Sequence, residues 1–220
     1  MARNEGSKMP RPGFLVTFEG IEGSGKSTQV DRLADHLKRM GREVLKTREP
    51  GGTPIGDRVR SILLDPTHEE MSPKTELYLI LASRAQHVAQ VIRPAISGGK
   101  IVLCDRFIHA TIAYQGYGRG LRADFVEAAC VPASDRVSPR VVFLLDVDVA
   151  TAMKRLAHRG PMNRIDREAI GFHEQVRKGY LKMASRHHRL IRKIDASQPI
   201  DVVAQAIQKG IHPYLAVRHV

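Results

Sequence analysis

The sequence predicts an α/β fold in which a mainly parallel β-sheet of about five strands is flanked by helices, and three observations support it. Short, mostly apolar runs alternate with longer segments of helical spacing, the pattern of parallel strands joined by crossover helices. The first apolar run ends in a glycine-rich turn that opens a helix. Two later runs end on an aspartate, as expected where polar side chains collect at the carboxyl edge of a parallel sheet.

Residues 14–47 are predicted to form a first strand–helix–strand unit. Residues 14–18 are a short apolar run, typical of a strand that is covered on both faces. After this run, apolar side chains recur at the spacing of one helix face, at Val30, Leu33, Ala34 and Leu37. The segment stops at Gly41, a residue type favoured just after a helix, and residues 43–47 follow as the second strand.

The rest of the chain continues the alternation of strands and helices. Further strands are predicted at 101–104, 141–145 and 194–195. Helices are predicted at 74–92, around 123–130, at 150–157, from about 168 to 193, and after residue 199. A basic stretch with a Gly-Pro pair, residues 159–164, interrupts the helical pattern.

The length of 220 residues suits one domain, and we predict that residues 14–220 form it. Apolar residues make up 42% and charged residues 26%, which excludes disorder as the dominant state. No apolar run approaches the ~20 residues of a membrane span, so no membrane partner is expected. Residues 1–13 lack an apolar core and are predicted to be a flexible N-terminal arm rather than a signal peptide.

The charge and cysteine content narrow the class further. Two cysteines are too few for a disulfide framework or a typical zinc site, and we expect a cytoplasmic protein. A net charge of +12 indicates an anionic partner, which can be nucleic acid, an acidic surface or small phosphates. Aromatic residues are only 5% and tryptophan is absent, so stacking platforms for single-stranded nucleic acid are scarce.

A phosphate-binding motif, G-x-x-x-x-G-K-[ST], lies between the first predicted strand and the first predicted helix. Glycines let backbone N–H groups turn inward around phosphates, and the helix N-terminus adds positive potential. Lys26 is expected to reach the outer phosphates of ATP, and the Ser27 hydroxyl to bind Mg²⁺. The fold is therefore predicted to be of the P-loop NTPase type. The predicted ATP-binding residues of the loop are Gly20, Ile21, Glu22, Gly23, Ser24, Gly25, Lys26 and Ser27.

A phosphate loop indicates a nucleoside triphosphate but does not by itself define the reaction. The chain lacks the Asn-Lys-x-Asp segment expected of guanine-specific switches, and it is too short for motor and helicase folds. The remaining class is the small phosphotransferases, in which a second substrate accepts the phosphoryl group.

Two polar segments follow predicted strands and suit such a transfer. Asp105 and Arg106 come after the strand at 101–104, where a carboxylate can hold Mg²⁺ or its water and a guanidinium can reach phosphates. Arg48, Glu49 and Pro50 enter a Gly-Gly turn at the same edge of the sheet. These three are predicted to bind a phosphate-bearing acceptor.

Further arginines suit the binding of substrates. Arg84 interrupts an apolar stretch of a predicted helix and is assigned to the substrate site. Arg155, Arg159 and Arg164 surround a Gly-Pro pair in a predicted lid, about residues 155–166. Such a lid can close over ATP and bring a guanidinium, that of Arg159 above all, to the charge that develops during transfer.

Together these segments resemble the thymidylate kinases (dTMP kinases) of bacteria, a family of P-loop nucleoside monophosphate kinases. The resemblance is carried by residues 18–28, 47–53, 83–87, 105–106, 113–120, 159–164 and 194–199. The Arg-Glu-Pro-Gly-Gly-Thr turn is the specific element, since other P-loop phosphotransferases usually lack it. The resemblance implies transfer of the γ-phosphoryl group of ATP to dTMP for dTTP biosynthesis, with Mg²⁺ as cofactor, and a homodimer.

The resemblance also implies how the acceptor phosphate and sugar are held. Glu22 would contact the 3′-hydroxyl of the sugar, and Arg48 and Arg106 would grip the phosphate. In the bacterial subgroup a lid arginine acts on the moving phosphoryl group in place of a basic residue in the phosphate loop, and Arg159 fits that pattern. The predicted catalytic residues are Lys26, Arg106, Arg159 and Glu22.

For the base, the resemblance implies that Arg84 hydrogen-bonds the thymine edge and that Gln115 lies beside the base or sugar. Tyr114 would crowd the C2′ position and reject ribonucleotides, and Thr111 belongs to the same substrate site. Family members commonly place a phenylalanine over the thymine ring where this chain has Ile80. Weaker thymidine binding, or tolerance of other bases, is therefore expected.

Two alternatives remain at this point. The same scaffold can phosphorylate another nucleoside or deoxynucleoside monophosphate, or a non-nucleotide acceptor. A P-loop protein without transfer activity could instead bind nucleic acid, and residues 177–193, with seven Lys or Arg and no acidic residue, favour this. Such a run is usually a solvated helix face, so nucleic acid is not the expected partner.

Overall fold

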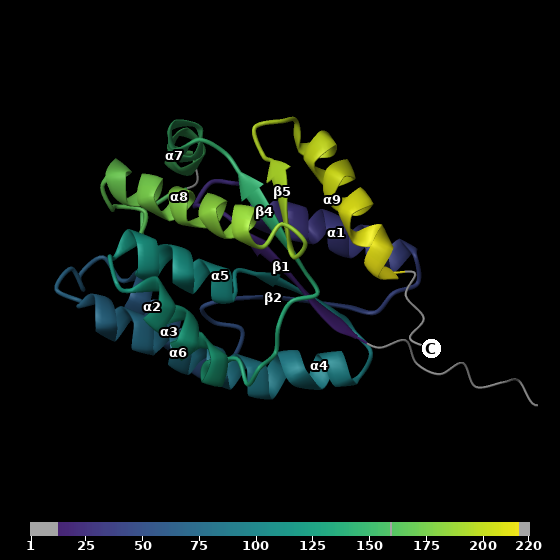
Figure 1. Ribbon diagram of the computed structural model, residues 1–220, viewed down its shortest axis with the longest axis horizontal. Helices are drawn as coiled ribbons and strands as arrows, with labels where there is room; N and C mark the ends of the chain where they lie inside the picture. The colour runs from purple at the N-terminus through teal and green to yellow at the C-terminus, as the bar shows by residue number, and fades with distance from the viewer. Residues whose placement is uncertain (1–12, 159, 216–220) are drawn as a thin grey trace, which may run out of the picture.

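Five parallel strands form one sheet in the part of the chain that the computed structural model describes, residues 13–158 and 160–215 (Figure 1). The strands are β1 (Phe14–Glu19), β2 (Val44–Arg48), β3 (Ile101–Asp105), β4 (Val141–Asp146) and β5 (Ile191–Asp195). Their order across the sheet is β2-β3-β1-β4-β5, and every neighbouring pair is parallel. The order reverses beside β1, so the carboxyl ends of β1, β3 and β4 frame the place where such sheets bind ligands.

Helices cover both faces of this sheet. They are α1 (Lys26–Arg39), α2 (Pro54–Leu64), α3 (Pro73–His87), α4 (Arg93–Ser97), α5 (Ile108–Thr111), α6 (Ala123–Ala133), α7 (Val149–Ala157), α8 (Ile170–Arg186) and α9 (Ile200–Leu215), with π-helical segments η1 (Val88–Ile92) and η2 (Ile112–Gly118). Helices α1 and α9 pack together on one side, whereas α2, α3 and α6 lie on the other (Figure 1). The predicted α/β class with a parallel sheet of five strands is confirmed.

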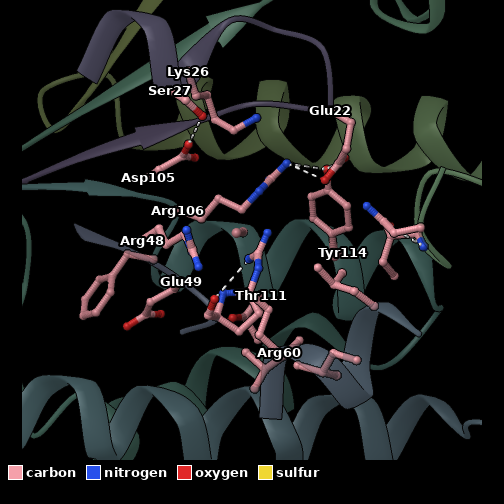
Figure 2. Close-up of a pocket in the computed structure, with 18 of the residues that line it drawn as sticks. Glu22, Lys26, Ser27, Arg48, Glu49, Arg60, Asp105, Arg106, Thr111 and Tyr114 are labelled. Atoms are coloured by element: carbon pink, nitrogen blue, oxygen red, sulfur yellow. Dashed lines mark hydrogen bonds and ion pairs between the residues drawn. The ribbon is translucent and has the colours of Figure 1, made fainter. Parts of the chain in front are cut away.

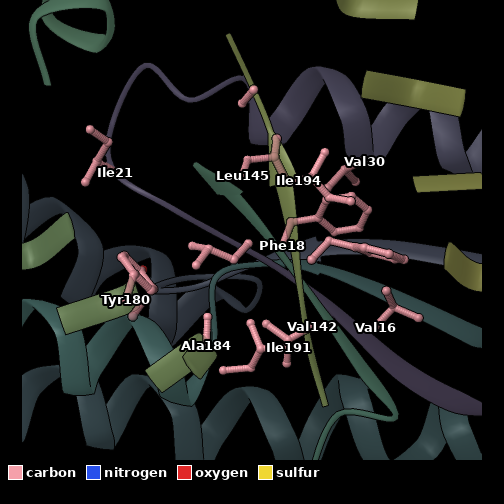
Figure 3. Packing of buried hydrophobic residues seen from close by; sticks show 14 of the residues in the cluster. Val16, Phe18, Ile21, Val30, Val142, Leu145, Tyr180, Ala184, Ile191 and Ile194 are labelled. Carbon is pink, nitrogen blue, oxygen red and sulfur yellow. The ribbon is translucent and has the colours of Figure 1, made fainter. Parts of the chain in front are cut away.

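Strand β1 is apolar because it contributes to a core on each face of the sheet. Val16 and Phe18 belong to the larger cluster, together with Val30 of α1 (Figure 3). Leu15 points to the opposite face and packs in a second cluster with Val88 of η1. A strand that is buried on both faces reads as a continuous apolar run, which is the pattern that identified it.

Residues 1–12 of the predicted N-terminal arm lie outside the described residues. None of the described helices is long and apolar enough to cross a membrane.

The predicted helix over residues 168–193 is wrong at its C-terminal end. Helix α8 ends at Arg186, His187 leaves the helical conformation (φ −118°, ψ 42°), and β5 starts at Ile191 instead of residue 194. Ile191 and Ile194 are buried against the sheet, where β5 pairs with β4. Their spacing of three residues also fits a helix, so only the pairing with β4 decides between the two structures.

Two further segments form helices outside those predicted from the sequence. Helix α2 begins with Pro54 and is capped by Thr53, whose side-chain oxygen accepts from the Gly56 N–H at 2.9 Å. Helix α5 and segment η2 run without a break after β3. They bring Thr111 and Tyr114 to the carboxyl end of the sheet.

A glycine allows α8 to approach η2 closely. A Cβ atom on Gly179 of α8 would lie 2.6 Å from atoms of the Tyr117 side chain. Real side chains do not adopt this separation, so the contact depends on glycine. The approach also brings Tyr180 of α8 next to Tyr114 of η2, with ring centroids 6.4 Å apart in an edge-to-face arrangement.

Gly179→Ala should therefore destabilise the protein. The added methyl group must displace Tyr117, and overpacking costs ~1–3 kcal/mol, whereas alanine gains back about 1 kcal/mol of helix propensity. We expect thermal unfolding followed by circular dichroism to show a Tm lower by about 2–4 °C. Gly171→Ala in the same helix is the matched control, because no described atom beyond its chain neighbours and the nearby backbone of its own helix lies within 4 Å of its Cβ position. A Tm for Gly179→Ala equal to that of the control would contradict this packing.

Candidate active site

A cavity of about 550 Å³ opens at the carboxyl ends of β1, β2 and β3 (Figure 2). The predicted site residues that line it are Glu22, Gly23, Gly25, Lys26, Ser27, Arg48, Glu49, Pro50, Ile80, Arg84, Asp105, Arg106, Thr111, Tyr114, Gln115, Arg155 and Arg164. Gly20, Ile21 and Ser24 do not line it, because all three are buried and Ile21 packs in the core. Arg159 lies outside the described residues.

The phosphate loop has the backbone shape that its glycines predict. Gly20, Gly23 and Gly25 have φ values of 141°, 72° and 88°, which residues with a side chain rarely adopt. A Cβ atom on Gly23 would also lie 2.3 Å from the Ala152 carbonyl oxygen. Gly25 is the N-cap of α1, so the loop leads straight to a helix N-terminus, where anions are stabilised.

Lys26 folds back over the loop. Its Nζ donates to the Ile21 carbonyl oxygen at 2.8 Å and to the Gly20 carbonyl oxygen at 3.2 Å. Burial, together with the nearby Arg106, lowers the pKa of Lys26 to about 8, although Asp105 acts in the opposite direction. The ammonium group is thus mostly protonated at neutral pH and held at the mouth of the loop.

Ser27 and Asp105 meet across the site. The Ser27 hydroxyl donates to Asp105 Oδ2 at 2.7 Å (Figure 2). Asp105 ends β3, and the parallel pairing of β3 with β1 places it beside the start of α1. A hydroxyl and a carboxylate are hard oxygen donors that suit Mg²⁺. Among the described residues no group of three His, Cys, Asp or Glu side chains could hold a metal, so such an ion would need phosphate and water ligands as well.

Arg106 is the best-anchored cation of the cavity. Its Nη2 donates to Glu22 Oε1 at 2.7 Å and its Nη1 to the Gly20 carbonyl oxygen at 2.9 Å. The guanidinium carbon also lies 4.8 Å from the centroid of the Tyr114 ring, and the Tyr114 hydroxyl donates to Glu22. Burial alone would raise the pKa of Glu22, but Arg106 and Lys26 lower it below its usual value. Glu22 is therefore ionised at neutral pH.

The turn after β2 is held by α3. Glu49 is buried, and its carboxylate accepts from Arg84 Nε at 2.7 Å and pairs with His87 Nδ1 at 3.1 Å. The other ring nitrogen of His87 lies 2.6 Å from the Thr47 hydroxyl. In addition, the N–H of Gly51 donates to the Ser83 hydroxyl at 3.1 Å. One face of α3 thus fixes the turn, and Glu49 faces this helix.

Arg84 is fully buried at the inner end of the cavity. Besides Glu49, its Nη2 donates to the Thr111 hydroxyl at 2.8 Å and its Nη1 to Cys130 Sγ at 3.4 Å. A guanidinium has five N–H groups. The three contacts leave two N–H groups not engaged with described residues, on a side chain that lines the cavity.

Arg60 is a site residue that the sequence patterns did not reveal. It lies on α2, lines the cavity, and its Nη1 donates to the Pro50 carbonyl oxygen at 3.1 Å. Burial lowers the pKa of Arg60, and nearby Arg48 and Arg106 lower it further. Helix α2 was detectable from the Thr-Pro start and the apolar spacing after it, but nothing in that pattern singles out this arginine.

In the described part of the lid, Arg155 contacts the segment after β5, whereas Arg164 contacts α2 and α3. Both Nη atoms of Arg155 donate to the Ala196 carbonyl oxygen at 3.1 Å. Arg164 is buried and donates to the Leu63 carbonyl oxygen at 2.9 Å and to Glu76. Glu76 of α3, which the sequence patterns also missed, accepts from Gln115 Nε2 at 2.7 Å. Arg164 therefore lies with Glu76 rather than at the phosphate loop, and its assignment to ATP stays a prediction.

Comparison with known proteins adds independent evidence. A family model described as thymidylate kinase matches residues 18–207. The chain is 46% identical over 200 residues to the thymidylate kinase of Syntrophotalea carbinolica, covering 88% of this chain and 93% of that protein. It is 47% identical over 204 residues to that of Pelotomaculum thermopropionicum, covering 92% and 94%. For the Pseudomonas putida enzyme the identity is 46% over 194 residues, covering 88% and 94%.

The matched segment starts within β1 and ends within α9. It therefore encloses every element that lines the cavity, from the phosphate loop to the described part of the lid. On this evidence the chain belongs to the thymidylate kinase family.

Proposed function

We propose that this chain is an ATP-dependent dTMP kinase, which transfers the γ-phosphoryl group of ATP to dTMP and gives ADP and dTDP for dTTP biosynthesis. The observation that carries the proposal is the placement of cations around one cavity. Lys26 and the phosphate loop lie at one side, while Arg48, Arg60 and Arg106 approach from the other (Figure 2). Two phosphate-bearing ligands can then meet end to end, and the name of the relatives supports dTMP as the acceptor.

ATP is assigned to the phosphate loop and the helix behind it. The backbone N–H groups of the loop and the N-terminus of α1 bind its phosphates. Lys26, now resting on two loop carbonyl groups, moves onto the outer phosphates. Arg155, Arg159 and Arg164 of the lid are proposed to flank ATP, with Arg159 at the moving phosphoryl group.

Magnesium is part of the proposal. Ser27 and Asp105 would hold the ion, because their oxygens already lie together and face the cavity. When bound, the ion would neutralise phosphate charge during transfer. Its other ligands would come from ATP and water, since these two side chains are its only protein ligands in the proposal.

The acceptor phosphate is assigned to Arg48, Arg60 and Arg106. Glu22 keeps Arg106 in place through an ion pair, and it would also accept the 3′-hydroxyl of the sugar. Tyr114 is buried against this pair and would crowd the C2′ position, which disfavours ribonucleotides.

The base is assigned to the inner end of the cavity. Arg84 has two N–H groups not engaged with described residues, and the carbonyl oxygens of thymine are suitable acceptors. Thr111 and Gln115 flank this position, and the aliphatic side chain of Ile80 covers it. Glu49 would act here by holding Arg84.

Phosphoryl transfer depends mainly on the alignment of the two phosphate groups and on neutralisation of the charge of the transferring group. The acceptor phosphate is an anion near pH 7, since its second pKa is about 6, so no separate base is needed. Lys26, Arg106 and Arg159 would supply positive charge to the transferring group. We further propose that the enzyme acts in the cytoplasm as a homodimer.

The first test is the release of ADP from ATP and Mg²⁺ with dTMP as acceptor, compared with dUMP, dCMP, dGMP and UMP. We expect rapid turnover with dTMP and much slower turnover with the other four. Turnover with one of the others but not with dTMP would keep the chemistry and refute the assigned base. If none of the five acceptors supports ADP release and the protein binds DNA, the non-catalytic alternative would be supported instead.

Lys26→Ala should lower kcat by about 10²-fold or more, because a preorganised positive donor at the transferring phosphates is lost. Steady-state ADP release measures this effect, and circular dichroism verifies the fold. Lys38→Ala, an exposed lysine on the same helix, is the matched control and should retain full activity. Unchanged activity in Lys26→Ala would remove the phosphate loop from the mechanism.

Ile80→Phe should lower KM for dTMP by ~2- to 10-fold, because an aromatic ring over the base adds ~0.5–1.5 kcal/mol of stacking. The KM for ATP should not change, because this residue lies at the base end of the cavity. Tyr78→Phe, on the exposed face of the same helix, serves as control. No change, or a higher KM for dTMP, would mean that Ile80 does not cover the base.

A further inference from the structure

Glu19 is a buried carboxylate to which the proposed reaction gives no role. It is the last residue of β1, its exposed fraction is 0%, and it does not belong to the residues that line the cavity. Taking a carboxylate out of water is unfavourable unless hydrogen bonds replace the lost hydration. Each of its two oxygens accepts a hydrogen bond, and each of the two donors is in direct contact with Arg106.

The first partner is the backbone that follows Arg106. Glu19 Oε1 accepts from the N–H of Phe107 at 2.9 Å. This N–H belongs to the peptide group between Arg106 and Phe107, so the bond fixes the orientation of that peptide. Arg106 has a φ of 73°, in the left-handed region that is unfavourable for a residue with a long side chain. Its own N–H donates to the Phe18 carbonyl oxygen at 2.9 Å. The end of β1 therefore holds Arg106 in this conformation from both sides.

The second partner reaches the side chain of Arg106. Glu19 Oε2 accepts from the hydroxyl of Tyr180 at 2.9 Å. Because the hydroxyl proton points to Glu19, the oxygen is available as an acceptor for Arg106, whose Nη1 donates to it at 3.2 Å. Tyr180 comes from α8, more than 150 residues away in the sequence, so this bond also joins α8 to the site.

We propose that Glu19 is the positioning residue of Arg106: it fixes the strained backbone of Arg106 through the Phe107 N–H and orients its guanidinium through Tyr180. The proposal rests on the proposed function, in which Arg106 binds the acceptor phosphate. Glu19 itself touches neither substrate, and its effect on the reaction passes through Arg106 alone.

The main variant is Glu19→Gln, which has nearly the same shape. Its amide oxygen can still accept from Phe107, but its amide NH₂ group then faces the Tyr180 hydroxyl, so that hydroxyl loses its acceptor. Tyr180→Phe removes the second partner alone. Thr17→Val is the matched control, because Thr17 is equally buried on the same face of β1 and its hydroxyl makes no hydrogen bond with a described residue.

The kinetic test compares kcat and KM for dTMP and for ATP. We expect Glu19→Gln to lower kcat/KM for dTMP by about tenfold or more, since the buried Tyr180 hydroxyl loses its acceptor, with KM for ATP within about twofold of the wild type. Tyr180→Phe should show a smaller loss of the same kind. Thr17→Val should match the wild type.

A double-mutant cycle separates positioning from general damage. Arg106→Met should lower activity strongly, and adding Glu19→Gln to it should cost nothing more, because the residue through which Glu19 acts is already gone. Losses that multiply in the double variant would overturn the proposal. So would an unchanged kcat/KM for dTMP in Glu19→Gln.

A crystal structure of Glu19→Gln provides a readout that needs no substrate. We expect the Arg106 guanidinium to leave its bonds to Glu22 and the Gly20 carbonyl oxygen. If wild-type protein gives no dTMP-dependent ADP release, the proposed function fails, and this structure still decides the inference. An unmoved Arg106 would overturn it. If Glu19→Gln does not fold, the structure and kinetics of Tyr180→Phe decide the same question.

Discussion

The register of three neighbouring parallel strands determines where the phosphate loop, the acceptor turn and the Asp105–Arg106 pair lie. Phe18 of β1 and Arg48 of β2 both lie opposite Asp105 of β3. Since adjacent strands are about 4.8 Å apart, the phosphate loop, the acceptor turn and the Asp-Arg pair leave the sheet within ~10 Å of one another. A slip of one residue in β3 would turn Asp105 to the other face of the sheet and separate it from Ser27.

The second constraint is the repulsion among the arginines that this register brings together. Carboxylates oppose it locally: the partly buried Glu22 pairs with Arg106, and the buried Glu49 pairs with Arg84. Such pairs are stable in a low dielectric only when their other polar atoms also find partners, and contacts to tyrosine, threonine and backbone groups satisfy several of them here. Burial and, after it, the nearby Arg48 and Arg106 lower the pKa of Arg60, and an anionic ligand beside these arginines would offset their repulsion.

The sequence alone predicts the strands, their parallel arrangement and the phosphate loop, because each depends on local patterns: apolar runs, helical spacing and glycine. It does not predict partners that are distant in the chain. Glu49 was identified as a site residue, yet its contacts with Arg84 and His87 depend on how α3 packs. Glu19 follows the predicted strand at 14–18 and received no role from the sequence, because only the packing of α8 gives it one. The end of α8 was misplaced for the same reason, since pairing with β4 and not local preference starts β5.

The two outer strands of the sheet, β2 and β5, have a further consequence for the behaviour of the protein in solution. An exposed strand edge can pair with another chain, and lysine and arginine side chains on it oppose such association. Lys46 and Arg48 are the exposed residues of β2, and Arg192 and Lys193 are exposed on β5. Part of the net charge of +12 thus lies on the two outer strands, where it opposes the edge-to-edge pairing of two copies into one sheet. Because high salt screens this charge, it would favour aggregation.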